Sequence, residues 1–99
     1  MFLVVFRSRK RADIDRVAYD TEAARMEELA ALQPGYLGFR SYTAADGETV
    51  AISEWTDEAA ALGWRKVAEH RAAQARGRSD YYESYTMFAC DVSRIHRFP

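Results

Sequence analysis

The sequence lacks several features that mark particular classes of protein. It has one cysteine, two prolines and five glycines in 99 residues. Cys90 therefore cannot form an internal disulfide, which suits a reducing compartment, and its apolar neighbours favour a packed thiol over a nucleophile. No internal repeat, low-complexity segment or linker divides the chain. We expect one domain over residues 1–99, with a tail from about residue 93 that is loose or docked on a partner.

Long hydrophobic runs are absent as well. The longest, Met1 to Phe6, is far shorter than the roughly 20 residues that a membrane-spanning helix needs. A signal peptide carries its positive charges before the apolar run, whereas here they follow it. We therefore expect a cytoplasmic protein without a membrane segment, which starts at its own first strand.

A large excess of charge of one sign is also missing. The formal net charge is −1, so no overall field favours nucleic acid or an anionic membrane. Closely spaced cysteine and histidine metal ligands, a phosphate-binding glycine loop and a GxSxG nucleophile turn do not occur. The local exception is a basic run at Arg7, Arg9, Lys10 and Arg11, beside the expected start of a helix. Such a run can bind phosphates, although its ordinary interpretation is a solvated loop.

Regular hydrophobic patterning is what the sequence does contain, and 48% of its residues are hydrophobic, which fits a globular domain. Phe2–Phe6 is apolar at every position, and this predicts a strand buried on both faces. Alternation with aromatic and β-branched residues, and a hairpin loop at residues 45–47, predict three further strands. These are Tyr36–Thr43, Thr49–Trp55 and Tyr81–Val92.

Two other segments have helical periodicity. The first begins after Asp13, which is placed as an N-cap, and stops at Pro34-Gly35. The second begins after Asp57 or Thr56 and runs to about Arg76. Each segment is long enough to cover one face of a small sheet.

The order of elements predicts an α+β, ferredoxin-like βαββαβ fold with a four-stranded antiparallel sheet. Helices cover only one face of such a sheet, and the other face should be polar if it meets water. The apolar first strand predicts an apolar patch there instead, larger than soluble monomers usually expose. The aromatic residues considered for this patch are Tyr36, Tyr42, Trp55, Tyr82 and Tyr85. We therefore expect a second copy of the chain to cover it, which gives a symmetric homodimer.

Several segments together resemble a known family. They are FLVVFRSR at residues 2–9, PGYLGFRSY at 34–42, SEWTDEAAALGW at 53–64, EHRAAQARGR at 69–78 and YYESY at 81–85. The chain is thereby similar to the antibiotic biosynthesis monooxygenase family of dimeric α/β-barrel proteins. The resemblance implies protomers that pair sheet to sheet, and a cavity between helices and sheet for a hydrophobic, often polycyclic aromatic molecule. Some members resemble quinone-forming oxygenases without metal or flavin, others degrade heme, and many have no established activity.

The heme-degrading branch of this family carries an asparagine on its first strand. On its second helix it has a tryptophan that is followed ten positions later by a histidine. Trp64 matches the tryptophan, but Phe6, Arg7 and Ser8 stand around the place of the asparagine, and Gln74 stands ten positions after Trp64. Axial heme ligation is therefore disfavoured, and no cofactor is expected.

His70 is the predicted catalytic residue, because an imidazole accepts and donates protons near neutral pH. On a straight helix it would point about 120° away from Trp64, and Gln74 would point about 80° away. His70 and Trp64 therefore face one cavity only if the helix bends. The alternative places His70 on the helix surface, paired with Glu69 or Glu58.

The predicted substrate-binding residues are Trp64, Gln74, Tyr36 and Arg40. Trp64 either walls the cavity against a flat ring system or packs in the core, and the two roles are compatible. A tyrosine such as Tyr36, or Arg40, is a candidate to hold a substrate oxyanion, although Arg40 needs a carboxylate partner if it is buried. A dimer interface is the alternative for the tyrosines, and it is favoured for Tyr82 and Tyr85.

The predicted function is a cofactor-independent monooxygenase for a small phenolic or quinol-type substrate. In it His70 accepts a phenolic or activated C–H proton, and the resulting anion passes an electron to O₂ inside a dry cavity. One alternative is a non-catalytic module that binds or senses an apolar metabolite. Heme binding or degradation is another. Nucleic-acid binding ranks last, because the aromatic and glycine signature of RNA-binding strands is absent.

Overall fold

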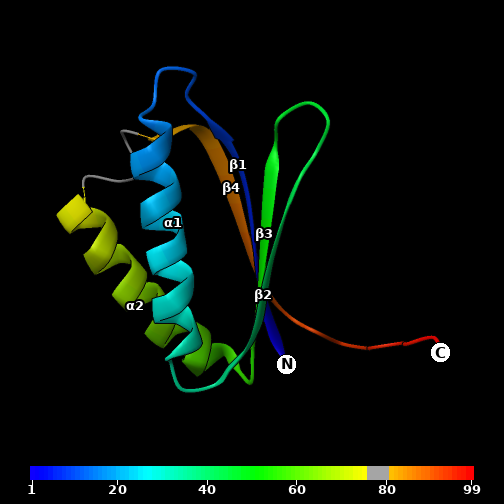
Figure 1. The fold of residues 1–99 in the computed structure, drawn as a ribbon. Coiled ribbons are helices and arrows are strands. Elements are labelled where there is room, and N and C mark those ends of the chain that lie inside the picture. The colour runs from blue at the N-terminus through cyan, green and yellow to red at the C-terminus, as the bar shows by residue number, and fades with distance from the viewer. Residues whose placement is uncertain (76–80) are drawn as a thin grey trace.

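The computed structural model describes residues 1–75 and 81–99, and the side chains of residues 1–71 and 81–99 (Figure 1). Its elements follow the predicted order of strand, helix, strand, strand, helix and strand. Their bounds are β1 Phe2–Lys10, α1 Arg16–Ala31, β2 Tyr36–Thr43, β3 Thr49–Trp55, α2 Glu58–Ala75 and β4 Tyr82–Asp91. The predicted end of the second helix at Arg76 lies outside the described residues.

The four strands form one antiparallel sheet in the order β2-β3-β1-β4. Both helices lie on the same side of this sheet, and the other side carries none (Figure 1). The predicted α+β, ferredoxin-like arrangement is therefore confirmed. Because β1 is central, its side chains have neighbours from both β3 and β4 on each face of the sheet.

Short acidic residues begin both helices. Asp15, and not Asp13, caps α1: its Oδ1 accepts a hydrogen bond of 3.0 Å from the backbone N–H three residues later. Asp13 is instead held by the guanidinium of Arg11 at 3.0 Å, so the helix starts later than predicted. At α2 the predicted cap is correct, because Asp57 Oδ1 accepts from the backbone N–H three residues later at 2.8 Å.

β1 is longer than the apolar run that predicted it. It continues through the basic residues to Lys10, so the interpretation of that run as a solvated loop is wrong for all but Arg11. The reason is pairing on both sides: Arg7 lies opposite Val50 and Thr86, in the two neighbouring strands. Two neighbours satisfy the backbone groups of β1 and hold its polar half extended.

The core lies between the helices and the end of the sheet at which the chain begins. Its buried apolar side chains are Phe2, Ala30, Trp55 and Ala61. Gly35 allows the start of β2 to approach α2 closely, since its φ is +82° and a Cβ there would lie 2.5 Å from the Cβ of Ala60. The Pro-Gly stop is thus a packing requirement as well as a turn.

The side of the sheet without helices is apolar in its middle. Leu3 and Val5 point to this side, because Phe2 faces the helices and strand side chains alternate. Their surface continues across the sheet to Ile52 and to Phe88, which is 49% exposed. The predicted apolar patch is therefore present, although Tyr42 is its only contributor from the aromatic residues considered for it.

Residues 92–99 follow β4 without forming a helix or strand, and they run away from the sheet on the side opposite the helices (Figure 1). Ile95 and Phe98 in this tail are exposed. Across residues 1–75 and 81–99, no helix combines the length and the apolar character that crossing a membrane requires. The cytoplasmic location stays a prediction.

Candidate functional site

Two aromatic clusters lie on the helix-facing side of the sheet. The first, here called the tryptophan cluster, is made of Phe2, Tyr36, Trp55 and Trp64. The indole of Trp64 stacks on that of Trp55 with 6.2 Å between ring centroids, and Tyr36 meets Trp55 edge-on at 5.7 Å. The Trp55 indole N–H donates to Ser53 Oγ at 2.9 Å, so its polar atom is satisfied inside the protein. This cluster is packed core.

The second cluster, here called the tyrosine cluster, is made of Phe6, Tyr19, Tyr82 and Tyr85. The Phe6 ring lies 5.4 Å from that of Tyr82 and 5.2 Å from that of Tyr85, between centroids. Tyr19 of α1 meets Tyr82 edge-on at 6.2 Å. Residues from β1, α1 and β4 therefore form one aromatic surface.

A bulge in β4 brings Tyr82 and Tyr85 to the same face. Glu83 is the extra residue, because its two neighbours in the sequence lie opposite consecutive residues of β1. Without the bulge, alternation would send two residues three positions apart to opposite faces. With it both tyrosines face the helices, 6.1 Å apart between ring centroids. Their predicted place in the dimer face is therefore wrong, and so is that of Tyr36 and Trp55, which lie in the tryptophan cluster.

The tyrosine cluster is partly exposed to solvent, whereas the centre of the tryptophan cluster is buried. Tyr85 is 43% exposed, and the next helix-facing residue of β4, Met87, is 40% exposed. Trp55, in contrast, is fully buried. An exposed aromatic and apolar surface that is bordered by helices is a place where a small hydrophobic molecule can bind.

An ion pair holds the two helices together near the tyrosine cluster. Arg71 of α2 donates to the two carboxylate oxygens of Glu22 of α1, at 2.8 and 3.1 Å. Glu22 lies about one helical turn after Tyr19. The hydrogen bond to Glu22 raises the pKa of the Arg71 guanidinium, so the arginine stays charged in this pair.

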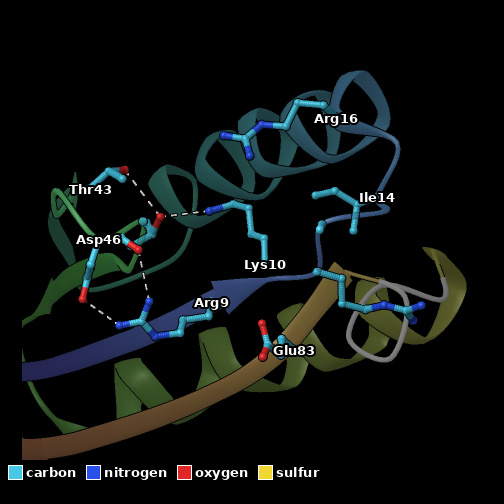
Figure 2. A pocket seen from close by; sticks show the side chains of 11 residues that line it. Arg9, Lys10, Ile14, Arg16, Thr43, Asp46 and Glu83 are labelled. Carbon is cyan, nitrogen blue, oxygen red and sulfur yellow. Dashed lines mark hydrogen bonds and ion pairs between the residues drawn. The ribbon is translucent and has the colours of Figure 1, made fainter.

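A pocket of about 490 Å³ adjoins the tyrosine cluster, between the β1–α1 connection and the β2–β3 hairpin (Figure 2). Lys10 lies between the two features, because its Nζ is 4.8 Å from the centroid of the Tyr19 ring. The charged residues that line the pocket are Arg9, Lys10, Arg11, Arg16, Asp46 and Glu83.

The structure separates His70 from the inward side of its helix. The His70 side chain is exposed, whereas Trp64, Val67 and Arg71 are half-buried. α2 is one uninterrupted helix, so it has no break that would bring His70 and Trp64 to one face. The side chain of Gln74 lies outside the described residues. The catalytic role of His70 stays a prediction.

Tyr36 and Arg40 lie on opposite sides of the sheet. Tyr36 packs on Trp55. A shift in the pairing register between Tyr36 and Gly38 reverses which face of the sheet the later side chains of β2 take. Arg40 lies opposite Ile52 and is exposed on the side without helices, so it does not need the carboxylate partner that burial would require. The structure therefore brings Tyr36 and Trp64 together against Trp55 and leaves Arg40 on the other side of the sheet, and the substrate-binding roles stay predictions.

Sequence reasoning missed Phe6, Lys10 and Tyr19 as parts of one surface. For the first two the signal is in the sequence, since alternation along β1 gives Phe6 and Lys10 the same face as Phe2. For Tyr19 no sequence signal points to β4, because its approach to Tyr82 depends on how α1 crosses the sheet.

Comparison with known proteins identifies the family. The profile described as antibiotic biosynthesis monooxygenase matches residues 1–76. The chain belongs to the antibiotic biosynthesis monooxygenase family. A curated relative, the uncharacterized protein YqjZ of Bacillus subtilis (strain 168), is 40% identical over 97 residues, which cover 98% of this chain and 83% of the relative. The resemblance seen in the sequence is therefore confirmed.

Solved structures have the same fold. A variant of SnoaB, a cofactor-independent oxygenase from Streptomyces nogalater, matches with a TM-score of 0.75 at 18% identity, over 95% of this chain and 94% of that one. A putative antibiotic biosynthesis monooxygenase from Nitrosomonas europaea matches with a TM-score of 0.75 at 15% identity, over 93% and 89% of the two chains. At these identities the likeness shows the fold alone.

Proposed function

We propose that this protein is a cofactor-independent monooxygenase that oxidises a small hydrophobic aromatic substrate of the phenolic or quinol type. Family membership supports the proposal, as does SnoaB, a cofactor-independent oxygenase with the same fold. The observation that carries it is the tyrosine cluster, an aromatic surface between helices and sheet at which Tyr85 and Met87 remain exposed. Flat ring systems pack on such rings edge to face or offset.

The substrate itself supplies the electrons in this reaction. A base removes a proton from an acidic ring CH₂ group, and the resulting anion passes one electron to O₂. The substrate radical and superoxide then combine through a new C–O bond, and the base returns its proton to the peroxide. Loss of water converts the hydroperoxide to a carbonyl. The substrate loses four electrons and O₂ accepts four, so no reductant is needed.

His70 is the proposed base, since the other histidine, His96, lies in the tail after β4. Its exposed ring must turn toward the substrate from the outer side of α2. We propose that the hydroxyl groups of Tyr82 and Tyr85 orient the substrate oxygens. Trp64 lies on the same side of the sheet but in the tryptophan cluster, where it stacks on Trp55.

Oxygen consumption with anthrone-type and quinol substrates tests the proposal. We expect one O₂ consumed per substrate, with one atom of ¹⁸O₂ in the product. His70→Ala should lower kcat/KM by about 100-fold, the scale of general base catalysis, while the control His96→Ala should leave it unchanged. Equal rates for wild type and His70→Ala would remove His70 from the mechanism. Tight binding without turnover would favour the non-catalytic module instead, and a shifted Soret band on addition of hemin would favour a heme protein.

We also propose a homodimer through the side of the sheet without helices. Its support is the apolar surface around Val5 and Phe88, which a monomer would leave in water. Sedimentation at micromolar concentration should give twice the chain mass, and Phe88→Asp should give a monomer. The matched control is Val17→Asp, at a 77% exposed position on α1, which should leave the mass unchanged. A monomeric mass for the wild type would contradict the proposal.

A further inference from the structure

The basic run of the sequence ends in the pocket beside the tyrosine cluster, and the proposed oxidation does not use it. Cations outnumber carboxylates in its lining, since three arginines and one lysine face two acidic residues. Each arginine has a carboxylate neighbour: Arg9 has Asp46 at 2.8 Å, Arg11 has Asp13 at 3.0 Å, and Arg16 has Asp20 at 3.5 Å. The hydrogen bond from Arg9 lowers the pKa of Asp46, so this carboxylate stays charged and occupies its arginine.

Lys10 differs from the arginines. Its Nζ donates to the neutral Thr49 Oγ1 at 2.9 Å and lies 4.8 Å from the Tyr19 ring centroid. Within residues 1–75 and 81–99, no carboxylate forms an ion pair with Lys10. The side chain is also half-buried. An ammonium that has lost water without gaining a counter-charge is costly, and an anion beside it would offset that cost.

The surroundings of Lys10 contain further groups that suit an anion. Figure 2 shows Lys10 extending across the pocket toward the threonines of the β2–β3 hairpin, with Arg16 on the α1 side. The Arg16 guanidinium carbon lies 5.7 Å from the same Tyr19 ring. Both side chains of the Arg16–Asp20 ion pair are exposed, so the pair contributes little to stability. Arg16 is therefore able to turn toward a ligand. Thr43 and Thr49, with hydroxyl oxygens 3.4 Å apart, supply neutral hydrogen-bond donors.

Glu83 is the lining group that opposes an anion. Figure 2 shows it away from the threonines, on the far side of Arg9 from Asp46. The pKa of the Arg9 guanidinium is raised mainly by the hydrogen bond to Asp46, and the charge of Glu83 adds a smaller contribution. Glu83 therefore lies nearer to Arg9 than to the threonines that Lys10 reaches. Among the cations of the lining, Lys10 is therefore the one for which no ion pair is found within the described residues.

We propose that this pocket binds an oxyanion, carried as a carboxylate or a phosphate group on a small molecule, with Lys10 as its principal ligand and Arg16 and Thr49 as supporting ones. The site adjoins the tyrosine cluster at Tyr19, and its anion binding does not depend on the proposed oxidation. The volume admits a group the size of a phosphate or a benzoate together with water.

The sequence offers a direct readout, because Lys10 and Lys66 are its two lysines. Protein labelled with ¹³C-lysine is titrated separately with inorganic phosphate and with sodium benzoate, at an ionic strength held constant with NaCl. We expect the Lys10 ε-CH₂ signal to shift and saturate while that of Lys66, which is exposed on α2, does not. The anion that saturates at lower concentration shows which carrier the pocket prefers.

Calorimetry on variants completes the test. Lys10→Met should weaken binding by about tenfold or more, through loss of a charge-assisted hydrogen bond. Lys66→Met is the matched control and should bind as the wild type does, and Lys10→Arg should retain binding because it keeps the charge. Parallel, non-saturating shifts of both lysines would overturn the proposal, as would unchanged binding by Lys10→Met. The wild-type titration and Lys10→Arg keep the test decisive if Lys10→Met does not fold.

Discussion

The two aromatic clusters on the helix-facing side of the sheet are built from similar residues, but they differ in how far their rings are exposed to solvent. In the tryptophan cluster Trp55 is fully buried, and its indole N–H is satisfied within the protein. In the tyrosine cluster Tyr85 is 43% exposed, and Lys10 brings a positive charge to the Tyr19 ring. The helices explain the difference, because Ala30 near the end of α1 and Ala61 near the start of α2 are buried at the tryptophan end. Small residues there allow the helices to approach the sheet.

This contrast shows that aromatic content alone does not locate a binding surface. A ring whose contacts are all made by the protein contributes to stability and has no area left for a ligand. A ring that is exposed beside helices has area to offer. We therefore expect substitutions in the tryptophan cluster to change stability, and those in the tyrosine cluster to change binding and turnover.

The largest effect is expected at Trp55. Trp55→Ala should lower the free energy of unfolding by about 3–5 kcal/mol, because it removes a fully buried indole and leaves a cavity. Chemical denaturation measures this change. The control is Phe98→Ala, at a 94% exposed position, which should stay within about 0.5 kcal/mol of wild type. If Trp55→Ala lowered the free energy of unfolding no more than the control does, the tryptophan cluster would not be the core.

Tyr85 tests the other side of the comparison. Tyr85→Leu should lower kcat/KM for the aromatic substrate by up to about tenfold, which corresponds to losing one aromatic contact, and should change stability little. Steady-state oxygen consumption measures the first effect and thermal unfolding the second. Tyr42→Leu, on the side of the sheet without helices, is the matched control and should retain kcat/KM. If Tyr85→Leu and Tyr42→Leu both kept the kcat/KM of the wild type, the tyrosine cluster would not be the surface that binds the substrate.

The ion pair between the helices should have a smaller effect on stability than Trp55. Arg71→Met should lower the midpoint of thermal unfolding, because it leaves the half-buried Glu22 carboxylate without its cation. A double-mutant cycle with Glu22→Gln should show positive coupling between the two residues. The Arg65–Glu69 pair lies within α2 and is more exposed, so Arg65→Met should have less effect. Zero coupling would mean that the helices at the tyrosine end are held by other contacts.

The smallest expected effect is a pH dependence of hairpin stability, which comes from the Arg9–Asp46 pair at the rim of the pocket. The hydrogen bond from Arg9 lowers the pKa of Asp46 in the folded protein below the ordinary aspartate value of about 3.9. The stabilisation of the hairpin by this pair is therefore complete above that value, and it is lost as the pH falls through the lower folded-state pKa. Carboxyl ¹³C NMR should show Asp46 titrating low, and Arg9→Met should return it toward the ordinary value. A midpoint that Arg9→Met does not move would contradict this assignment.

Much of the fold was predictable from local signals. Periodicity, Pro34-Gly35 and the cap at Asp57 identify the elements because these features act over a few neighbouring residues. Asp13 and Asp15 are equivalent as caps in the sequence, and the choice between them depends on whether Arg11 engages Asp13. The site was less predictable, because it depends on which face each strand residue takes after an irregularity in the pairing.

The sequence by itself determined the element order, the ferredoxin-like class and the family, since hydrophobic period and turn residues report on each segment separately. Only the tertiary structure decided which aromatic residues meet. The extra residue Glu83 in β4 reverses the alternation and brings Tyr82 beside Tyr85, Phe6 and Tyr19. The same assembly placed Lys10 against Tyr19 without a carboxylate among the described residues. A bulge and a helix crossing are set by pairing between distant segments, and no local pattern in the chain records them.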